Sequence, residues 1–181
     1  MRKLTLKQVR YPIGKYIAPN QPSATNVQDW VNTIEVFPKN ITSLTSNLNI
    51  AQLNWKYRPN GWTIKQVVHH CSDSHMNSFI RFKLAITEDA PTIKPYMEHL
   101  WAELPDGTEN DISDSILLLK AVHSKWVKLL NTFATEQWAR TFIHPEGNTI
   151  YRLDEALALY AWHCRHHTAH IEQAIKYKGK F

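Results

Sequence analysis

The 181-residue chain lacks any apolar run close to the roughly 18 residues that a membrane-spanning helix requires. Its first residues, MRKLTLKQVRYPIGKY, include basic side chains but neither an apolar stretch nor a small-residue cleavage site. They therefore do not match a secretory signal peptide. These absences lead us to expect a cytoplasmic protein with no membrane partner.

Cysteine is also scarce, with only Cys71 and Cys164 in the chain. Two cysteines without an export signal do not indicate the disulfide framework of a small secreted domain. Each cysteine lies next to a histidine, so a metal-binding thiolate is an alternative that the sequence leaves open.

Positive charge is present but not clustered. The formal net charge is +5 and the isoelectric point about 9.2, yet the lysines and arginines are scattered along the chain. Scattered basic charge supplies only non-specific attraction to phosphates, so we expect no nucleic-acid partner. The ten histidines are the feature of the composition that needs an explanation.

Apolar residues recur at steps of three and four, the period of a helix, in four stretches. We predict helices over residues 27–48, 63–87, 113–133 and 153–177, and Thr63, Ser113 and Asp154 are candidate N-caps. Four helices of about 20 residues predict a single all-α domain over residues 1–181. The expected architecture is an antiparallel four-helix bundle with one long crossover.

The segments between these helices contain most of the proline and glycine. Residues 1–25 are expected to form an extended N-terminal arm, and residues 88–110 the long crossover. Strand signals are weak, although 142–144 and 149–151 flank a Pro-Glu-Gly turn and could pair as a small hairpin.

Four histidines share one face of the last predicted helix, within the run WHCRHHTAH. At about 100° per residue, His166, His167 and His170 all lie within about 60° of His163, on the apolar side. Burying four imidazoles is costly unless they are hydrogen-bonded or bind something. Either i, i+4 pair, His163 with His167 or His166 with His170, could bind one ion. Neither pair has the glutamate of the HExxH motif, which excludes that peptidase class.

The second predicted helix offers a partner for these histidines. His70 lies on the face that carries Val67, Ile80 and Leu84, whereas His69 points about 100° away. Bundles build metal sites from side chains on facing helices, so His70 is the better inward candidate. The same face continues through Asp73, Asn77 and Arg81, which indicates either the wall of a polar cleft or a solvated surface.

These motifs resemble the DinB/YfiT-like family. The likeness is carried by GWTIKQVVHHCSDSHMNSFIRFKLAITE and YAWHCRHHTAHI, and extends to YPIGKY, TIKPYMEHLWAEL and FIHPEG. It therefore covers almost the whole chain. The closest likeness is to the YfiT branch of metal-dependent hydrolases, which is related to bacillithiol S-transferases.

The resemblance implies which histidines bind metal. The family's pattern places one ligand eight residues after the tryptophan of the WT motif, which is His70 after Trp62, and an i, i+4 pair that matches His163 and His167. His166 and His170 then become candidates for contact with the substrate. The resemblance also implies a four-helix bundle, a homodimer and one divalent ion per subunit, zinc first and nickel second.

Three histidines leave one metal coordination position open, as in catalytic zinc sites. That position could activate a water for hydrolysis or a thiol for transfer. We therefore expect a metal-dependent hydrolase of a small molecule. The alternatives are an S-transferase that uses a low-molecular-weight thiol and a non-catalytic metal-binding bundle. Asp73, one turn from His70, is the candidate general base, and Asn77 and Arg81 are candidate substrate contacts.

Overall fold

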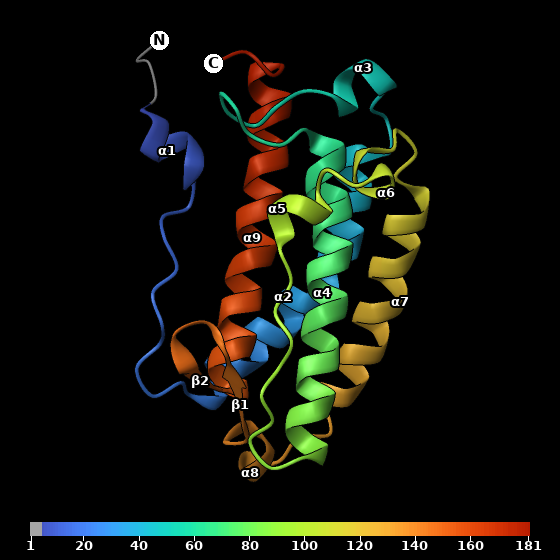
Figure 1. The fold of residues 1–181 in the computed structure, drawn as a ribbon. Coiled ribbons are helices and arrows are strands. Elements are labelled where there is room, and N and C mark those ends of the chain that lie inside the picture. The colour runs from blue at the N-terminus through green and yellow to red at the C-terminus, as the bar shows by residue number, and fades with distance from the viewer. Residues whose placement is uncertain (1–4) are drawn as a thin grey trace.

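The computed structural model describes residues 5–181 and contains a four-helix bundle (Figure 1). Its long helices are α2 (Ala24–Thr45), α4 (Ile64–Thr87), α7 (Ser113–Leu130) and α9 (Leu153–Tyr177). Helix α9 packs against α2 and α4, and α7 packs against the same two helices. The predicted all-α fold is confirmed. Among the helices of the described residues, none combines the length and apolar character needed to cross a bilayer.

The direction of the helices follows from the long crossover. In Figure 1, α4 and α7 begin at one end of the bundle, whereas α2 and α9 begin at the other. The pairs α4–α9 and α2–α7 are thus antiparallel, but α4 and α7 run in the same direction. The crossover makes this possible because it returns the chain along the length of the bundle, and it contains the short helices α5 (Glu98–Trp101) and α6 (Pro105–Thr108).

Local capping explains most helix boundaries. Thr63 caps α4 as predicted, because its hydroxyl accepts the Gln66 backbone N–H at 3.3 Å while the Gln66 side chain accepts the Thr63 N–H at 3.1 Å. The other two predicted caps are wrong. Helix α7 is preceded by Ile112 in the cap position, and α9 by Arg152.

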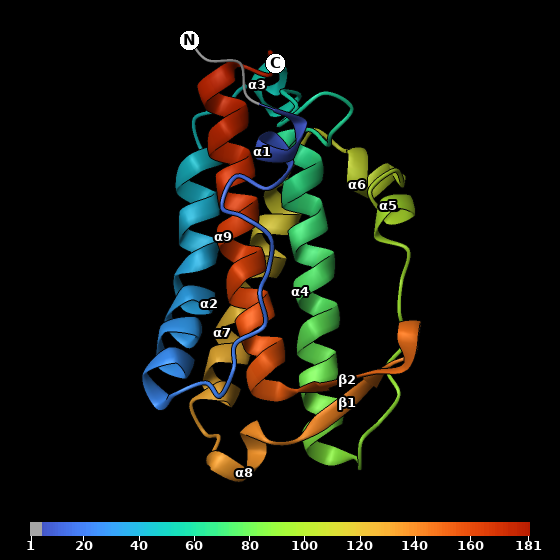
Figure 2. The same ribbon diagram turned by 90° about the vertical axis from the view of Figure 1, so that its left-hand side faces the viewer.

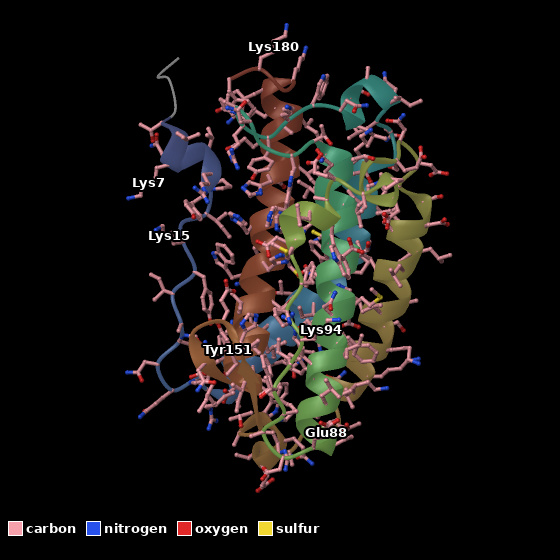
Figure 3. The ribbon with its side chains drawn as sticks, in the orientation of Figure 1. Lys7, Lys15, Glu88, Lys94, Tyr151 and Lys180 are labelled. Carbon is pink, nitrogen blue, oxygen red and sulfur yellow. The ribbon has the colours of Figure 1, made fainter. Side chains whose placement is uncertain are left out.

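The predicted extended arm needs correction. Residues Leu6–Arg10 form a short helix, α1, and α2 begins at Ala24 rather than at residue 27. The reason for the earlier start is that the Ser23 hydroxyl accepts the Asn26 backbone N–H at 3.2 Å, which caps the helix. The segment between α1 and α2 runs along α9 (Figure 2). Lys7 on α1 and Lys15 on this segment point away from the bundle (Figure 3).

The predicted hairpin is present as β1 (Thr141–His144) and β2 (Thr149–Arg152), which pair antiparallel. Ile143 also exchanges two backbone hydrogen bonds of 2.9 Å with the start of the crossover, at Pro91 and Ile93. The hairpin, which contacts α4 through β1 and α9 through β2, therefore holds the start of the crossover in place. The remaining short elements are α3 (Ile50–Leu53), α8 (Thr135–Trp138) and the 3-10 turn Glu146–Asn148.

The core lies between the four long helices and includes the fully buried Phe37, Phe82, Trp126 and Leu157. Ile80, which was assigned to the apolar face of the second helix, is instead 49% exposed. On a helix it lies about 80° from His70, at the margin of the face that α9 covers.

Candidate metal centre

Three histidines from two antiparallel helices meet inside the bundle. His70 lies in the second turn of α4, and His163 and His167 are one turn apart on α9. One ring nitrogen of each lies within 4.8 Å of the others, and the Nε2 atoms of His70 and His163 are 3.2 Å apart. Within residues 5–181, no other group of three or more metal-binding side chains converges in this way.

These three rings are uncharged at neutral pH. Burial and, to a smaller extent, the nearby His166 lower the pKa of His70 to about 4. Burial also holds the pKa values of His163 and His167 well below the usual range, and the neighbouring imidazoles add to the effect. A neutral imidazole keeps one nitrogen lone pair, so the cluster offers three nitrogen donors of the kind that bind zinc or nickel.

Hydrogen bonding determines which ring nitrogen of His167 has a lone pair available to bind a metal ion. The backbone carbonyl of Arg10 can only accept, so the His170 Nε2–H must donate to it, at 3.1 Å. The Nδ1 of His170 is then an acceptor, and the His167 Nδ1–H donates to it at 3.4 Å. The lone pair of His167 is therefore on Nε2. Tyr57 stacks on His170 with ring centroids 3.7 Å apart, which helps to hold this arrangement.

The three histidines form part of the wall of a cleft of about 550 Å³. The end of α1, the loop before α4, the crossover and the hairpin complete the wall. Its charged side chains are Arg10, Arg58, Arg81, Glu98 and Glu146. The three guanidinium groups suit a ligand that carries a carboxylate or phosphate.

Two further predicted residues, His166 and His170, also line this cleft. His166 packs between Trp162 and Tyr11, with ring centroids 4.3 Å and 6.0 Å away. Its Nδ1 is buried and has no hydrogen-bond partner among the described residues. A polar group of a bound ligand could therefore satisfy it.

The structure does not place Asp73 or Asn77 on the wall of the cleft. Asp73 is partly buried on α4, where burial and the nearby Asp106 raise its pKa to about 6. The Asn77 side-chain amide donates to the backbone carbonyl of Asp73 at 2.8 Å. Arg81, the third polar residue predicted on this face, does line the cleft.

Several residues near the site were not assigned a role from the sequence. Tyr160 lines the cleft, donates its hydroxyl to the Ser74 carbonyl at 3.2 Å and lies with its ring centroid 5.5 Å from that of His163. His75 Nε2 lies 2.9 Å from His163 Nδ1, and His123 on α7 contacts His75. In the sequence, the feature that points to a buried position for His123 is that it lies on the apolar face of α7.

Neither cysteine belongs to the group of converging metal-binding side chains. Cys71 and Cys164 are both free and buried. Burial raises the pKa of both thiols well above the usual range, so neither is a thiolate at neutral pH. The donor set that the structure brings together therefore consists of imidazoles alone.

Comparison with known proteins identifies relatives of this chain. A curated protein of Bacillus cereus named "Putative metal-dependent hydrolase" is 47% identical over 172 residues, which covers 94% of this chain and 98% of that protein. A protein of Bacillus thuringiensis with the same description matches to the same extent.

Solved structures give a consistent result. YfiT from Bacillus subtilis, described as a probable metal-dependent hydrolase with an unusual four-helix bundle topology, superposes with a TM-score of 0.92 and 42% identity. The match covers 95% of this chain and 98% of YfiT. Residues 33–171 match the DinB superfamily. The chain therefore belongs to the DinB superfamily.

Proposed function

We propose that this protein is a metal-dependent hydrolase of a small anionic molecule, and that His70, His163 and His167 bind one divalent ion. The observation that carries the proposal is the convergence of three neutral imidazoles within 4.8 Å, in the wall of a cleft. The names of the relatives support it. Imidazole ligands suit both zinc and nickel, and we propose zinc as the ion.

The chemistry of the donor set fits such an ion. The tautomer of His167 directs its Nε2 lone pair away from His170, and no carboxylate or thiolate of the described residues completes the ligand group. Three protein ligands leave one position open, as in catalytic zinc sites. The ion would act as a Lewis acid that lowers the pKa of a bound water towards 7.

The cleft would supply binding and orientation. Arg81 and Arg58, which line the cleft, would hold a carboxylate or phosphate of the substrate through charge-assisted hydrogen bonds. The Tyr160 hydroxyl, which donates to the Ser74 carbonyl in this structure, would become a donor to an oxygen that gains negative charge during the reaction if it turned from that carbonyl towards the substrate.

One observation favours a second candidate, a metal-dependent thiol S-transferase. Hydrolysis usually needs a general base within hydrogen-bond reach. Asp73 does not line the cleft, and the carboxylates that do, Glu98 and Glu146, are exposed at its edge. A thiol bound to a metal loses its proton without a carboxylate base, so the same cleft could serve thiol transfer.

The two functions can be separated by a paired activity screen. The zinc-loaded and nickel-loaded protein would be assayed with carboxylate-bearing esters and amides, and in parallel with low-molecular-weight thiols plus an electrophile. We expect hydrolysis that disappears on chelation and in His163→Ala. Thiol conjugation without hydrolysis would overturn the hydrolase proposal in favour of the transferase. No turnover in either arm would favour the non-catalytic bundle.

A further inference from the structure

A chain of buried histidines connects the proposed metal centre to the opposite side of the bundle. His75 on α4 is 0% exposed and His123 on α7 is 1% exposed. His123 Nδ1 lies 2.5 Å from the Ile34 carbonyl oxygen, and its Nε2 lies 2.6 Å from His75 Nδ1. His75 Nε2 lies 2.9 Å from His163 Nδ1. The contacts thus pass from α2 through α7 and α4 to α9.

The position of each proton in this chain follows from its first member. A backbone carbonyl can only accept, so the His123 Nδ1–H donates to Ile34. The neutral His123 ring then has its lone pair on Nε2, which must accept from the His75 Nδ1–H. By the same step, His75 Nε2 accepts from the His163 Nδ1–H. The lone pair of His163 is therefore on Nε2, the nitrogen that faces His70.

We propose that His123, acting through His75, is a positioning residue that holds His163 in the Nδ1–H tautomer and so presents its Nε2 lone pair to the metal. The inference rests on the proposed metal-binding role of His163. Its consequence is that α7, which supplies no ligand, controls the affinity of the site. In the metal-free protein the His70 Nε2–H can donate to His163 Nε2, across the 3.2 Å that separates them.

A packing role for His123 makes a different prediction. The His123 ring packs near Phe37 and Trp126, with centroids 5.5 Å and 6.1 Å away. Phenylalanine at this position would keep an aromatic ring in that environment but would offer no acceptor to His75. Glutamine would keep an acceptor, because its side-chain oxygen can receive the His75 Nδ1–H. The two variants therefore separate the tautomer from the packing.

The first experiment determines directly which ring nitrogen of each histidine in this chain carries the proton. Side-chain ¹⁵N NMR of the metal-free wild type should show the proton on Nδ1 in His75, His123 and His163. A proton on Nε2 of His163 would overturn the proposal. This measurement needs neither metal nor activity, so its outcome does not depend on whether the protein is a hydrolase.

The second experiment measures zinc affinity by competition with a chromophoric chelator. We expect His123→Phe to weaken zinc binding about tenfold, the lower end of the effect of groups that orient metal ligands. His123→Gln should bind close to the wild-type level. His69→Gln is the matched control, because His69 is a buried α4 histidine that contacts Ser115 and the Glu109 carbonyl instead.

Equal affinity of His123→Phe and wild type would contradict the proposal, as would an equal loss in His69→Gln. A wild type that binds no zinc would contradict the proposed function instead, while the NMR result would still decide the tautomers.

Discussion

Acid should destabilise this protein strongly, because several of its buried histidines are uncharged in the folded state. Burial lowers the pKa of His70 and His123 to about 4, and that of His170 to about 3. In the unfolded chain the same groups would titrate near 6.5. The unfolded state therefore binds more protons below pH 6.5, so the stability is complete above that pH and falls as the pH drops towards 4.

The expected loss of unfolding free energy follows from how far the pH lies below the pKa of these groups in the unfolded chain. At pH 5 each of the three groups is about 1.5 pH units below its unfolded pKa, which corresponds to about 2 kcal/mol at about 1.4 kcal/mol per unit. The three together should lower the free energy of unfolding by about 6 kcal/mol, a large part of the roughly 5–15 kcal/mol typical of a folded domain.

The assay is urea denaturation of the chelator-treated protein, followed by far-UV circular dichroism at pH 7.5, 6.5 and 5.0. The His170→Gln variant lacks one of the three groups. Its free energy of unfolding should therefore fall by about 2 kcal/mol less than that of the wild type between pH 7.5 and 5.0. A wild-type loss below about 1 kcal/mol would refute the reasoning that these rings are held neutral by the fold.

Three further predictions concern the cleft, a helix start and the assembly. Arg81→Met should raise KM for an anionic substrate at least about tenfold with a smaller change in kcat, because it removes a charge-assisted hydrogen bond; an unchanged KM in steady-state assays would refute the contact. Thr63→Ala should lower the free energy of unfolding by about 1 kcal/mol through loss of the α4 cap, measured by urea denaturation, whereas no loss would show that the cap contributes little. Light scattering should give twice the chain mass of 21.1 kDa if the homodimer implied by the family likeness forms, and a monomer mass would rule it out.

The helices could be predicted from the sequence where an apolar stripe and a recognisable start coincide. Helix α9 has the predicted bounds, and α4 begins directly after its predicted cap at Thr63. The start of α2 was missed because Asn26 takes the place of the Glu or Gln expected three residues after the cap. Helix α1 is too short for its apolar period to be detected.

The candidate site was predictable only in part. The helix period placed four histidines on one face of the last helix but left two pairs open, and the family resemblance selected His163 and His167. The structure brings these two together with His70. His123 and His75 could not be assigned from the sequence, because their role depends on which helices face each other. The same holds for Arg10 and Arg58, which reach the cleft from the end of α1 and from a loop.

The central claim is most directly tested by measuring bound metal. The wild type would be loaded with zinc, freed of excess ion and analysed by inductively coupled plasma mass spectrometry, beside His70→Ala, His163→Ala, His167→Ala and the control His69→Gln. The account predicts one zinc per chain in the wild type and the control, and little or none in the three alanine variants. Equal zinc in the wild type and the three alanine variants would contradict it.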